Sequence, residues 1–262
     1  MAEIGRRNFE TPREPVALFD APADAQAVLL ERPNRFLGIA GINGKAHRIH
    51  IPDPGRLGEL LYSGARILLK HSGRDGGRKT AWTLMAATAP DGGEWVLTNT
   101  FLHRRIATEL ISSPIGPFDS IAELKAEVSV GNSRLDFMIT HRDGVRRYVE
   151  VKGCTLVYGD TCLFPDAPTA RGRRHMQELS RLAKEGCRTT VLFLVLANAV
   201  RVAPNEDTDP HFSQAFRLAL SSGVEAIGHR ISYDGQTVSA CGEVSCCGQG
   251  VDGIHSAGRF KQ

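Results

Sequence analysis

The chain has 262 residues, 42% of them hydrophobic, which is enough for one large or two small domains with buried cores. Its 32 Lys and Arg against 29 Asp and Glu give a formal net charge of +3, a mildly basic balance that permits a polyanionic partner without requiring one. The start of the chain has no apolar run, and the longest apolar stretch, 191–197, is too short to span a bilayer. We therefore expect a globular, cytoplasmic protein with no membrane partner.

Residues 1–22 are polar, contain three prolines and show no periodicity, so we expect an extended arm. Over 23–98, short strands alternate with turn residues, and Asn43-Gly44 suits a type I′ hairpin turn. Five or six short strands with one brief helical turn favour a small β-barrel of the oligonucleotide-binding (OB) type.

Basic side chains are concentrated in 31–80, where ten Lys or Arg stand against four Asp or Glu. This excess suits a phosphate-binding surface, and a solvated face accounts for it equally well. The candidate nucleic-acid-binding residues of this segment are Arg32, Arg35, Arg56 and Lys79.

After residue 98 the pattern changes to helices and strands. Leu102, Ile106 and Leu110 recur at helical spacing, and Asp209 followed by Pro210 is typical of a helix start. The ranges expected to form helices are 101–111, 171–185 and 210–223, and those expected to form strands are 123–130, 134–140, 146–151 and 191–196. We thus predict a two-domain α/β (α+β) protein, with a mixed sheet flanked by helices over 99–235 and a flexible tail over 236–262.

The six cysteines are expected to be free thiols, because they lack the paired C-x-x-C spacing of a zinc site. A metal at Cys241, Cys246, Cys247 and His255 is the alternative.

Three residues on two expected strands carry the strongest chemical signal. Glu150 and Lys152 share one face of a strand because side chains alternate, and Asp136 on the preceding strand can meet Glu150 across the pair. Two carboxylates with open coordination positions suit Mg²⁺ or Mn²⁺ acting on a phosphodiester, with Lys152 orienting water or offsetting charge. Taken alone, Glu-x-Lys on a strand is more often a solvated face.

The surroundings strengthen this interpretation. Glu109 on the preceding helix is the candidate third acid, and Glu127 on the neighbouring strand competes for that role. Arginines at a helix N-terminus oppose the macrodipole, so phosphate contact explains them better than helix stability does. The phosphate-contact candidates of this domain are Arg134, Arg171, Arg174 and His175, the last being a proton carrier or a plain hydrogen-bonding residue.

Several segments closely resemble the sugar fermentation stimulation protein A family over about 25–235. They are 32–36, 52–57, 79–81, 99–100, 132–137, 149–156, 164–175 and 223–225. The resemblance implies an OB-like barrel followed by a nuclease-like domain of the PD-(D/E)xK class, with DNA binding of little sequence preference and a link to sugar utilisation genes. It also implies that Asp136, Glu150 and Lys152 form the catalytic set, with Glu109 as the helix acid. Arg104 departs from the family, which usually has Asn there.

Three hypotheses follow. The first is a metal-dependent nuclease acting on double- or single-stranded DNA, and the second is a DNA-binding regulator that grips the backbone without cutting. The third is single-strand binding by the barrel alone, for which only Phe36, Tyr62 and Trp82 offer stacking rings, each of them equally a core candidate. The sequence leaves open whether the protein is a monomer or a homodimer.

Overall fold

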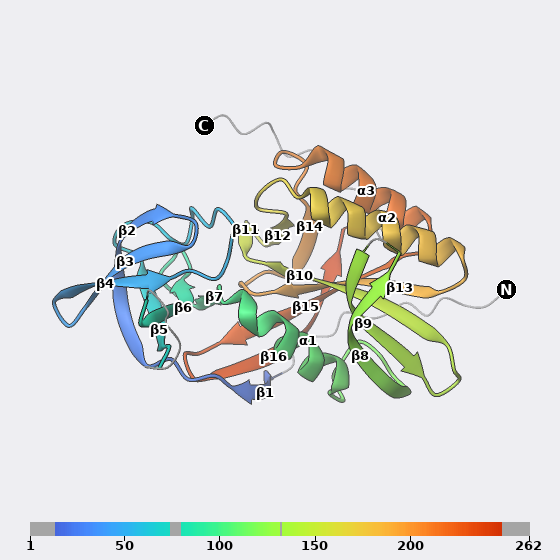
Figure 1. The fold of residues 1–262 in the computed structure, drawn as a ribbon, viewed down its shortest axis with the longest axis horizontal. Coiled ribbons are helices and arrows are strands. Elements are labelled where there is room, and N and C mark those ends of the chain that lie inside the picture. The colour runs from blue at the N-terminus through green and yellow to red at the C-terminus, as the bar shows by residue number, and fades with distance from the viewer. Residues whose placement is uncertain (1–13, 74–79, 132, 248–262) are drawn as a thin grey trace.

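The hairpin at Asn43 and Gly44 has positive φ angles of 49° and 75° at its two central residues, as a type I′ turn requires. It joins two strands of an N-terminal barrel in the computed structural model, which describes residues 14–73, 80–131 and 133–247. Figure 1 shows this barrel at one end of the molecule and a larger mixed sheet with three helices at the other.

Five strands close the barrel. β2 pairs with β3, β3 with β4 and β5 with β2, all antiparallel, while β4 and β6 run parallel and β6 returns to β5. This order confirms the predicted OB-like barrel. The strands are β2 (Ala25–Asn34), β3 (Leu37–Ile42), β4 (Lys45–His50), β5 (Arg66–His71) and β6 (Trp82–Thr88). Leu29, Ile49, Ile67, Leu69 and Leu84 fill its interior.

Three parallel strands form the centre of the second domain, with β10 pairing to β13 and β13 to β15. Antiparallel strands extend the sheet on both sides, β9 and β8 beyond β10, and β16 and β1 beyond β15. The strands are β1 (Val16–Asp20), β8 (Ile121–Val130), β9 (Ser133–His141), β10 (Arg146–Cys154), β13 (Arg188–Val195), β15 (Glu225–Tyr233) and β16 (Thr237–Cys246).

Helices cover both faces of this sheet, which explains why β13 is apolar at every position from Val191 to Val195. Leu192 packs in the core with α1 (His103–Ser112), whereas its neighbour Phe193 packs in the core with α2 (Ala170–Lys184) and α3 (Pro210–Ser221). Alternate residues of a strand point to opposite faces, so a strand buried on both sides needs apolar residues at every position. The three predicted helices and the buried central strand are confirmed.

Short elements link the two domains. β7 (Trp95–Leu97) pairs with β6 of the barrel and, through Trp95, with Tyr233 of β15, and it leads through η1 (Thr100–Leu102) into α1. A small sheet extends from β16 in the order β14 (Arg201–Pro204), β12 (Thr161–Phe164) and β11 (Leu156–Tyr158). The loop 165–169 follows β12 along the chain.

The prediction of a flexible tail from residue 236 is wrong for 237–246. This segment is β16, which lies between β15 and β1 and buries Val238, Ala240 and Val244. Its small residues give a weak hydrophobic signal, and Cys241 is the extra residue of a β-bulge beside Gly242, which interrupts the pairing register.

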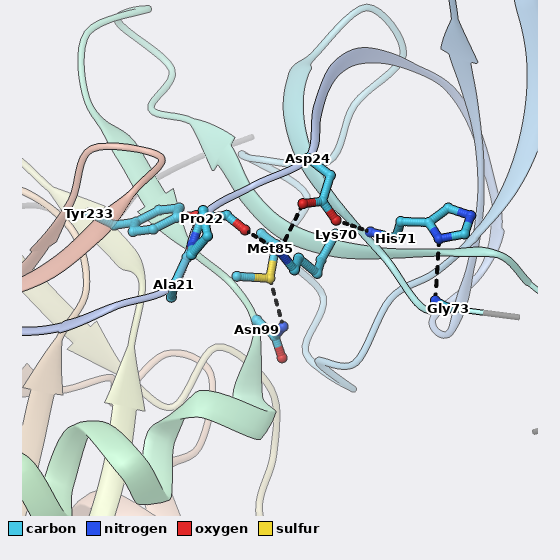
Figure 2. Close-up of polar contacts among 9 residues, drawn as sticks. All are labelled: Ala21, Pro22, Asp24, Lys70, His71, Gly73, Met85, Asn99 and Tyr233. Carbon is cyan, nitrogen blue, oxygen red and sulfur yellow. Dashed lines mark hydrogen bonds and ion pairs between the residues drawn. The ribbon is translucent and has the colours of Figure 1, made fainter. Parts of the chain in front are cut away.

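The predicted arm over 1–22 also joins the fold where it is described, since β1 pairs with β16. Figure 2 shows how the segment after β1 is fixed. The Tyr233 hydroxyl donates to the Ala21 carbonyl at 2.7 Å, and the Lys70 ammonium donates to the Pro22 carbonyl and to Asp24, both at 2.8 Å. Residues of both domains therefore hold this segment. No helix within the described ranges has the length and apolarity needed to cross a membrane.

Candidate metal and nucleic-acid site

Strands β9 and β10 separate at the level of Glu150. Their pairing ends at Phe137 and Val149, and beyond it the Asp136 carboxylate accepts the Val151 backbone N–H at 2.7 Å. A buried N–H freed at the end of a strand pair needs another acceptor, and this carboxylate supplies it. Beyond the end of this pairing, the carboxylates of Asp136 and Glu150 are close enough to interact electrostatically.

Glu150 is the most buried member of the set, with 2% of its surface exposed. Its Oε1 accepts hydrogen bonds from the Lys152 ammonium at 2.5 Å and from Nδ1 of His175 on α2. Burial opposes ionisation of Glu150, but the hydrogen bond from His175 and the positive charge of Lys152 outweigh it and lower the pKa of this carboxyl. Glu150 is therefore charged at neutral pH.

Asp136 behaves in the opposite way. Burial raises the pKa of its carboxyl, and the negative charge of Glu150 raises it further, against the Val151 N–H and the charge of Lys152. The two carboxylates thus repel each other, and a cation bound to both would relieve that repulsion.

The donor set fits a hard divalent ion. Glu150 Oε2 is buried and has no hydrogen-bond partner among the described residues, although a buried carboxylate oxygen normally has one. Together with Asp136 it offers the two carboxylates that Mg²⁺ or Mn²⁺ takes alongside water and phosphate oxygens. The described residues contain no group of three His, Cys, Asp or Glu able to hold a metal, so further ligands would be water or substrate.

The structure does not bring Glu109 to this site, which corrects the predicted role of a helix acid. The buried face of α1 consists of Ile106, Ala107, Leu110 and Ile111, and Glu109 is exposed. At about 100° per residue it lies well outside that face. His103 is the α1 residue nearest to β10, packed against Gly153.

Glu127 does not replace it. This residue on β8 forms ion pairs with Arg104 of α1 and, at 3.8 Å, with Arg134 of β9. Its carboxylate is therefore engaged by two guanidinium groups. Arg104 and Arg134 both remain more than half exposed, so each can also face solvent or a phosphate.

Of the predicted phosphate contacts, five arginines have exposed side chains, in two loops of the barrel, on β9 and on α2. His175, by contrast, is buried and serves Glu150, which corrects its assignment as a nucleic-acid-binding residue. Lys79 lies outside the described residues. The five exposed arginines are Arg35, Arg56, Arg134, Arg171 and Arg174.

The sequence predicts phosphate binding by Arg32, but in the structure its guanidinium binds backbone carbonyls. Its guanidinium donates to the carbonyls of Gly55 at 2.9 Å, Arg35 at 3.2 Å and Arg56. The carbonyls of Gly55 and Arg56 belong to the loop that follows β4, so Arg32 fixes this loop, and burial lowers the pKa of the guanidinium. Arg32 is therefore a structural residue.

This loop contacts the second domain. The Arg56 backbone N–H donates to the Asp166 carboxylate at 3.0 Å, and Asp53 accepts the Gly55 N–H at 2.7 Å. A cavity of about 320 Å³ lies between the two loops and is lined by residues of both domains. The turn residues Pro52 to Gly55 predict a loop. Its contact with Asp166 and the packing of His103 against Gly153 were not predicted, because both depend on tertiary packing.

Gly55 allows this close approach. A Cβ at this position would lie 2.3 Å from Asp166 Oδ2 and 2.9 Å from Asp53 Oδ1. We expect Gly55→Ala to lower the free energy of unfolding by about 1–3 kcal/mol, the usual cost of overpacking. Urea denaturation measures it, with Gly58→Ala as the matched control because a Cβ there meets nothing within 4 Å. Equal stabilities of the two variants would contradict the proposed tight contact.

Comparison with known proteins decides the family. Residues 30–98 match the SfsA N-terminal OB domain, and residues 101–237 match the sugar fermentation stimulation protein RE domain. The chain belongs to the sugar fermentation stimulation protein family. The resemblance inferred from the sequence is therefore confirmed.

Relatives within the sugar fermentation stimulation protein family are similar along most of their length. A sugar fermentation stimulation protein homolog of Methanococcoides burtonii is 40% identical over 88% of this chain and 95% of its own length. The homolog of Methanothermobacter thermautotrophicus is 43% identical over 78% of this chain and 85% of its own. The solved structure of Pyrococcus furiosus SfsA in complex with Ca²⁺ is 28% identical, with a TM-score of 0.79 over 88% of this chain and 99% of that one.

Proposed function

We propose that this protein binds DNA with little sequence preference and cleaves its phosphodiester bonds with Mg²⁺ or Mn²⁺ held by Asp136 and Glu150, as in PD-(D/E)xK nucleases. The observation that carries the proposal is the buried, charged Glu150 whose Oε2 has no partner among the described residues. The Ca²⁺ complex of Pyrococcus furiosus SfsA supports divalent-cation binding by this fold.

Each residue of the set has a distinct part in this chemistry. A bound divalent ion would polarise a phosphate oxygen and lower the pKa of an attacking water. Glu150 and Asp136 would supply its protein ligands, and His175 keeps the Glu150 carboxylate charged and oriented. Lys152 lies on the same face of β10 with 12% of its side chain exposed, so its ammonium can orient the water or offset negative charge in the transition state.

The exposed arginines on both domains would bind the DNA backbone. Arg35 and Arg56 lie on the barrel side of the domain junction, and Arg171 and Arg174 lie at the start of α2, the helix that carries His175. Guanidinium contacts to phosphates orient a nucleic acid without reading its bases. Binding of little sequence preference follows.

The activity test uses linear, circular and single-stranded DNA, each with Mg²⁺, with Mn²⁺ and with chelator. We expect cleavage in either metal and none in chelator, with binding retained in all three conditions. Absence of cleavage in every condition, together with retained binding, would reject the nuclease and favour the second candidate, a DNA-binding regulator of sugar utilisation genes. The exposed arginines favour that alternative because they would bind DNA whether or not the carboxylates cut it.

The salt dependence of DNA affinity tests these arginine–phosphate contacts. We expect Arg35→Ala or Arg56→Ala to reduce the slope of log K against log salt by about 1, since each phosphate contact releases roughly one counterion. Fluorescence anisotropy at several salt concentrations measures the slope. Arg188→Ala is the control, because this arginine begins β13 at the strand end remote from the domain junction. Equal slopes for all three variants would exclude a DNA-binding role for Arg35 and Arg56.

A further inference from the structure

Two phenylalanines lie exposed where the barrel meets the second domain. Phe36, between β2 and β3, is 54% exposed, and Phe101 of η1 is 63% exposed. The Phe101 ring stacks on the His50 imidazole with centroids 5.9 Å apart and planes 21° apart. The Ile51 N–H donates to the Phe36 carbonyl at 3.0 Å, so Phe36 lies beside the strand that carries His50. We call these three residues the aromatic rim, and both of its phenylalanines are more than half exposed.

The aromatic rim is defined as Phe36, His50 and Phe101, and chain neighbours of its two phenylalanines line the 320 Å³ cavity between the domains. Arg35, the neighbour of Phe36, and Thr100, the neighbour of Phe101, both line that cavity. Each phenylalanine is thus one residue along the chain from the cavity lining. The cavity continues between loops of both domains toward Asp53 and Asp166.

His103, which is half-buried, also lines this cavity. His103 Nε2 has no hydrogen-bond partner within the described part of the chain. Burial lowers the pKa of the imidazole to about 4, so it is neutral at pH 7 and can accept or donate one hydrogen bond at a free nitrogen. Gly153 gives it space, because a Cβ there would lie 2.2 Å from the His103 Cε1. An unused buried polar atom in a cavity lining indicates a ligand.

The junction combines cationic, aromatic and acidic groups. Arg35 and Arg56 provide exposed cations that suit phosphates, and the aromatic rim suits the faces of bases. The cavity lining includes the carboxylates of Asp53 and Asp166, which repel phosphate and accept hydrogen bonds from amine groups. Base amines and ring N–H groups are such donors, and in a nucleotide they are joined to a phosphate through the sugar.

We propose that this junction binds unpaired nucleotides of single-stranded DNA, with bases stacked on Phe36 and Phe101 and the polar edge of one base directed into the cavity toward His103. The inference rests on the proposed DNA binding and specifies the form of DNA that the site takes. In a duplex the base faces are covered by neighbouring pairs, so only a single strand or a frayed end can stack in this way. Gly153 of the cavity follows Lys152 directly, so the bound nucleotide lies next to the metal-site strand.

Binding to a single-stranded oligonucleotide that carries one 2-aminopurine tests this, with chelator present to prevent cleavage. Stacking on the rim is expected to quench the probe. Phe36→Ala and Phe101→Ala should each weaken single-strand affinity roughly fivefold to a hundredfold and reduce the quench, as for other base-stacking aromatics. The affinity of the same variants for duplex DNA should stay within about twofold of that of the unaltered protein, because duplex bases are not free to stack on the rings. Leu218→Ala on α3 is the control for removing an exposed apolar side chain.

The outcomes separate the inference from the proposed function. Unchanged single-strand affinity and quench in both Phe variants, with duplex binding and metal-dependent cleavage intact in the unaltered protein, would overturn the inference alone. Equal losses on single-stranded and duplex DNA would also overturn it, and so would tighter binding to RNA of the same sequence. If the unaltered protein bound neither DNA form, the proposed function would fail, and the inference with it.

Discussion

Replacing Glu150 with glutamine is expected to reduce metal-dependent DNA cleavage by at least about a hundredfold, the scale seen when one group that stabilises the transition-state charge is lost. The amide keeps the size of the side chain and can still accept the hydrogen bonds from Lys152 and His175 at one oxygen. It removes the negative charge and the free Oε2 that a divalent ion requires. Asp136→Asn should have an effect of the same order.

Glu109→Gln is the matched control for this experiment. It removes an equivalent charge from an acid that lies exposed outside the buried face of α1, so cleavage should be unchanged. Gel assays of cleavage, together with anisotropy measurements of DNA binding, distinguish lost chemistry from lost affinity. Full activity of Glu150→Gln, or loss of activity in Glu109→Gln alone, would show that the wrong carboxylates have been assigned to the metal.

Asp53→Asn is expected to stabilise the protein above pH 6. Burial, with the negative charge of Asp166 as a further cause and the Gly55 N–H opposing both, raises the pKa of the Asp53 carboxyl from 3.8 to about 6. Because the folded protein holds this proton more tightly than the unfolded chain, ionisation above pH 6 costs the folded state as much as roughly 3 kcal/mol. That cost diminishes as the pH falls from 6 to 3.8 and is absent below it.

The unfolding free energy in urea, measured at pH 7.5 and at pH 4, tests this expectation. Asp53→Asn should exceed the original protein at the higher pH and approach it at the lower one. Asp91→Asn is the control, because exposed Asp91 accepts the Gly93 N–H at 3.0 Å in the same local arrangement that Asp53 makes with Gly55. A stabilisation of equal size at both pH values would point to a cause other than the charge of Asp53.

Local patterns predicted much of this fold. Leu102, Ile106 and Leu110 predicted α1 from helical spacing, and the Asn43-Gly44 turn predicted the first hairpin of the barrel. Such signals act over a few residues and are complete within the sequence. β16 escaped prediction because its stability comes from pairing with β15 and β1, and not from its own small residues.

The candidate site divides in the same way. Alternation along a strand was enough to group Glu150 with Lys152, and the pairing of neighbouring strands added Asp136. The exposure of Glu109 follows from which face of α1 packs on the sheet, and the burial of His175 follows from how α2 lies over β10. Local sequence spacing does not specify how either helix packs on the sheet.

By itself the sequence indicated the family and the two-domain order and predicted the pair of Asp136 and Glu150, because these rest on local periodicity and on short motifs. Only the tertiary structure decided which charges are free to act. It turned Arg32 inward onto backbone carbonyls and brought Asp53 and Asp166 together across the domain junction. Burial and hydrogen bonding of a charged side chain depend on segments far apart in the chain, and these meet only when the two domains pack.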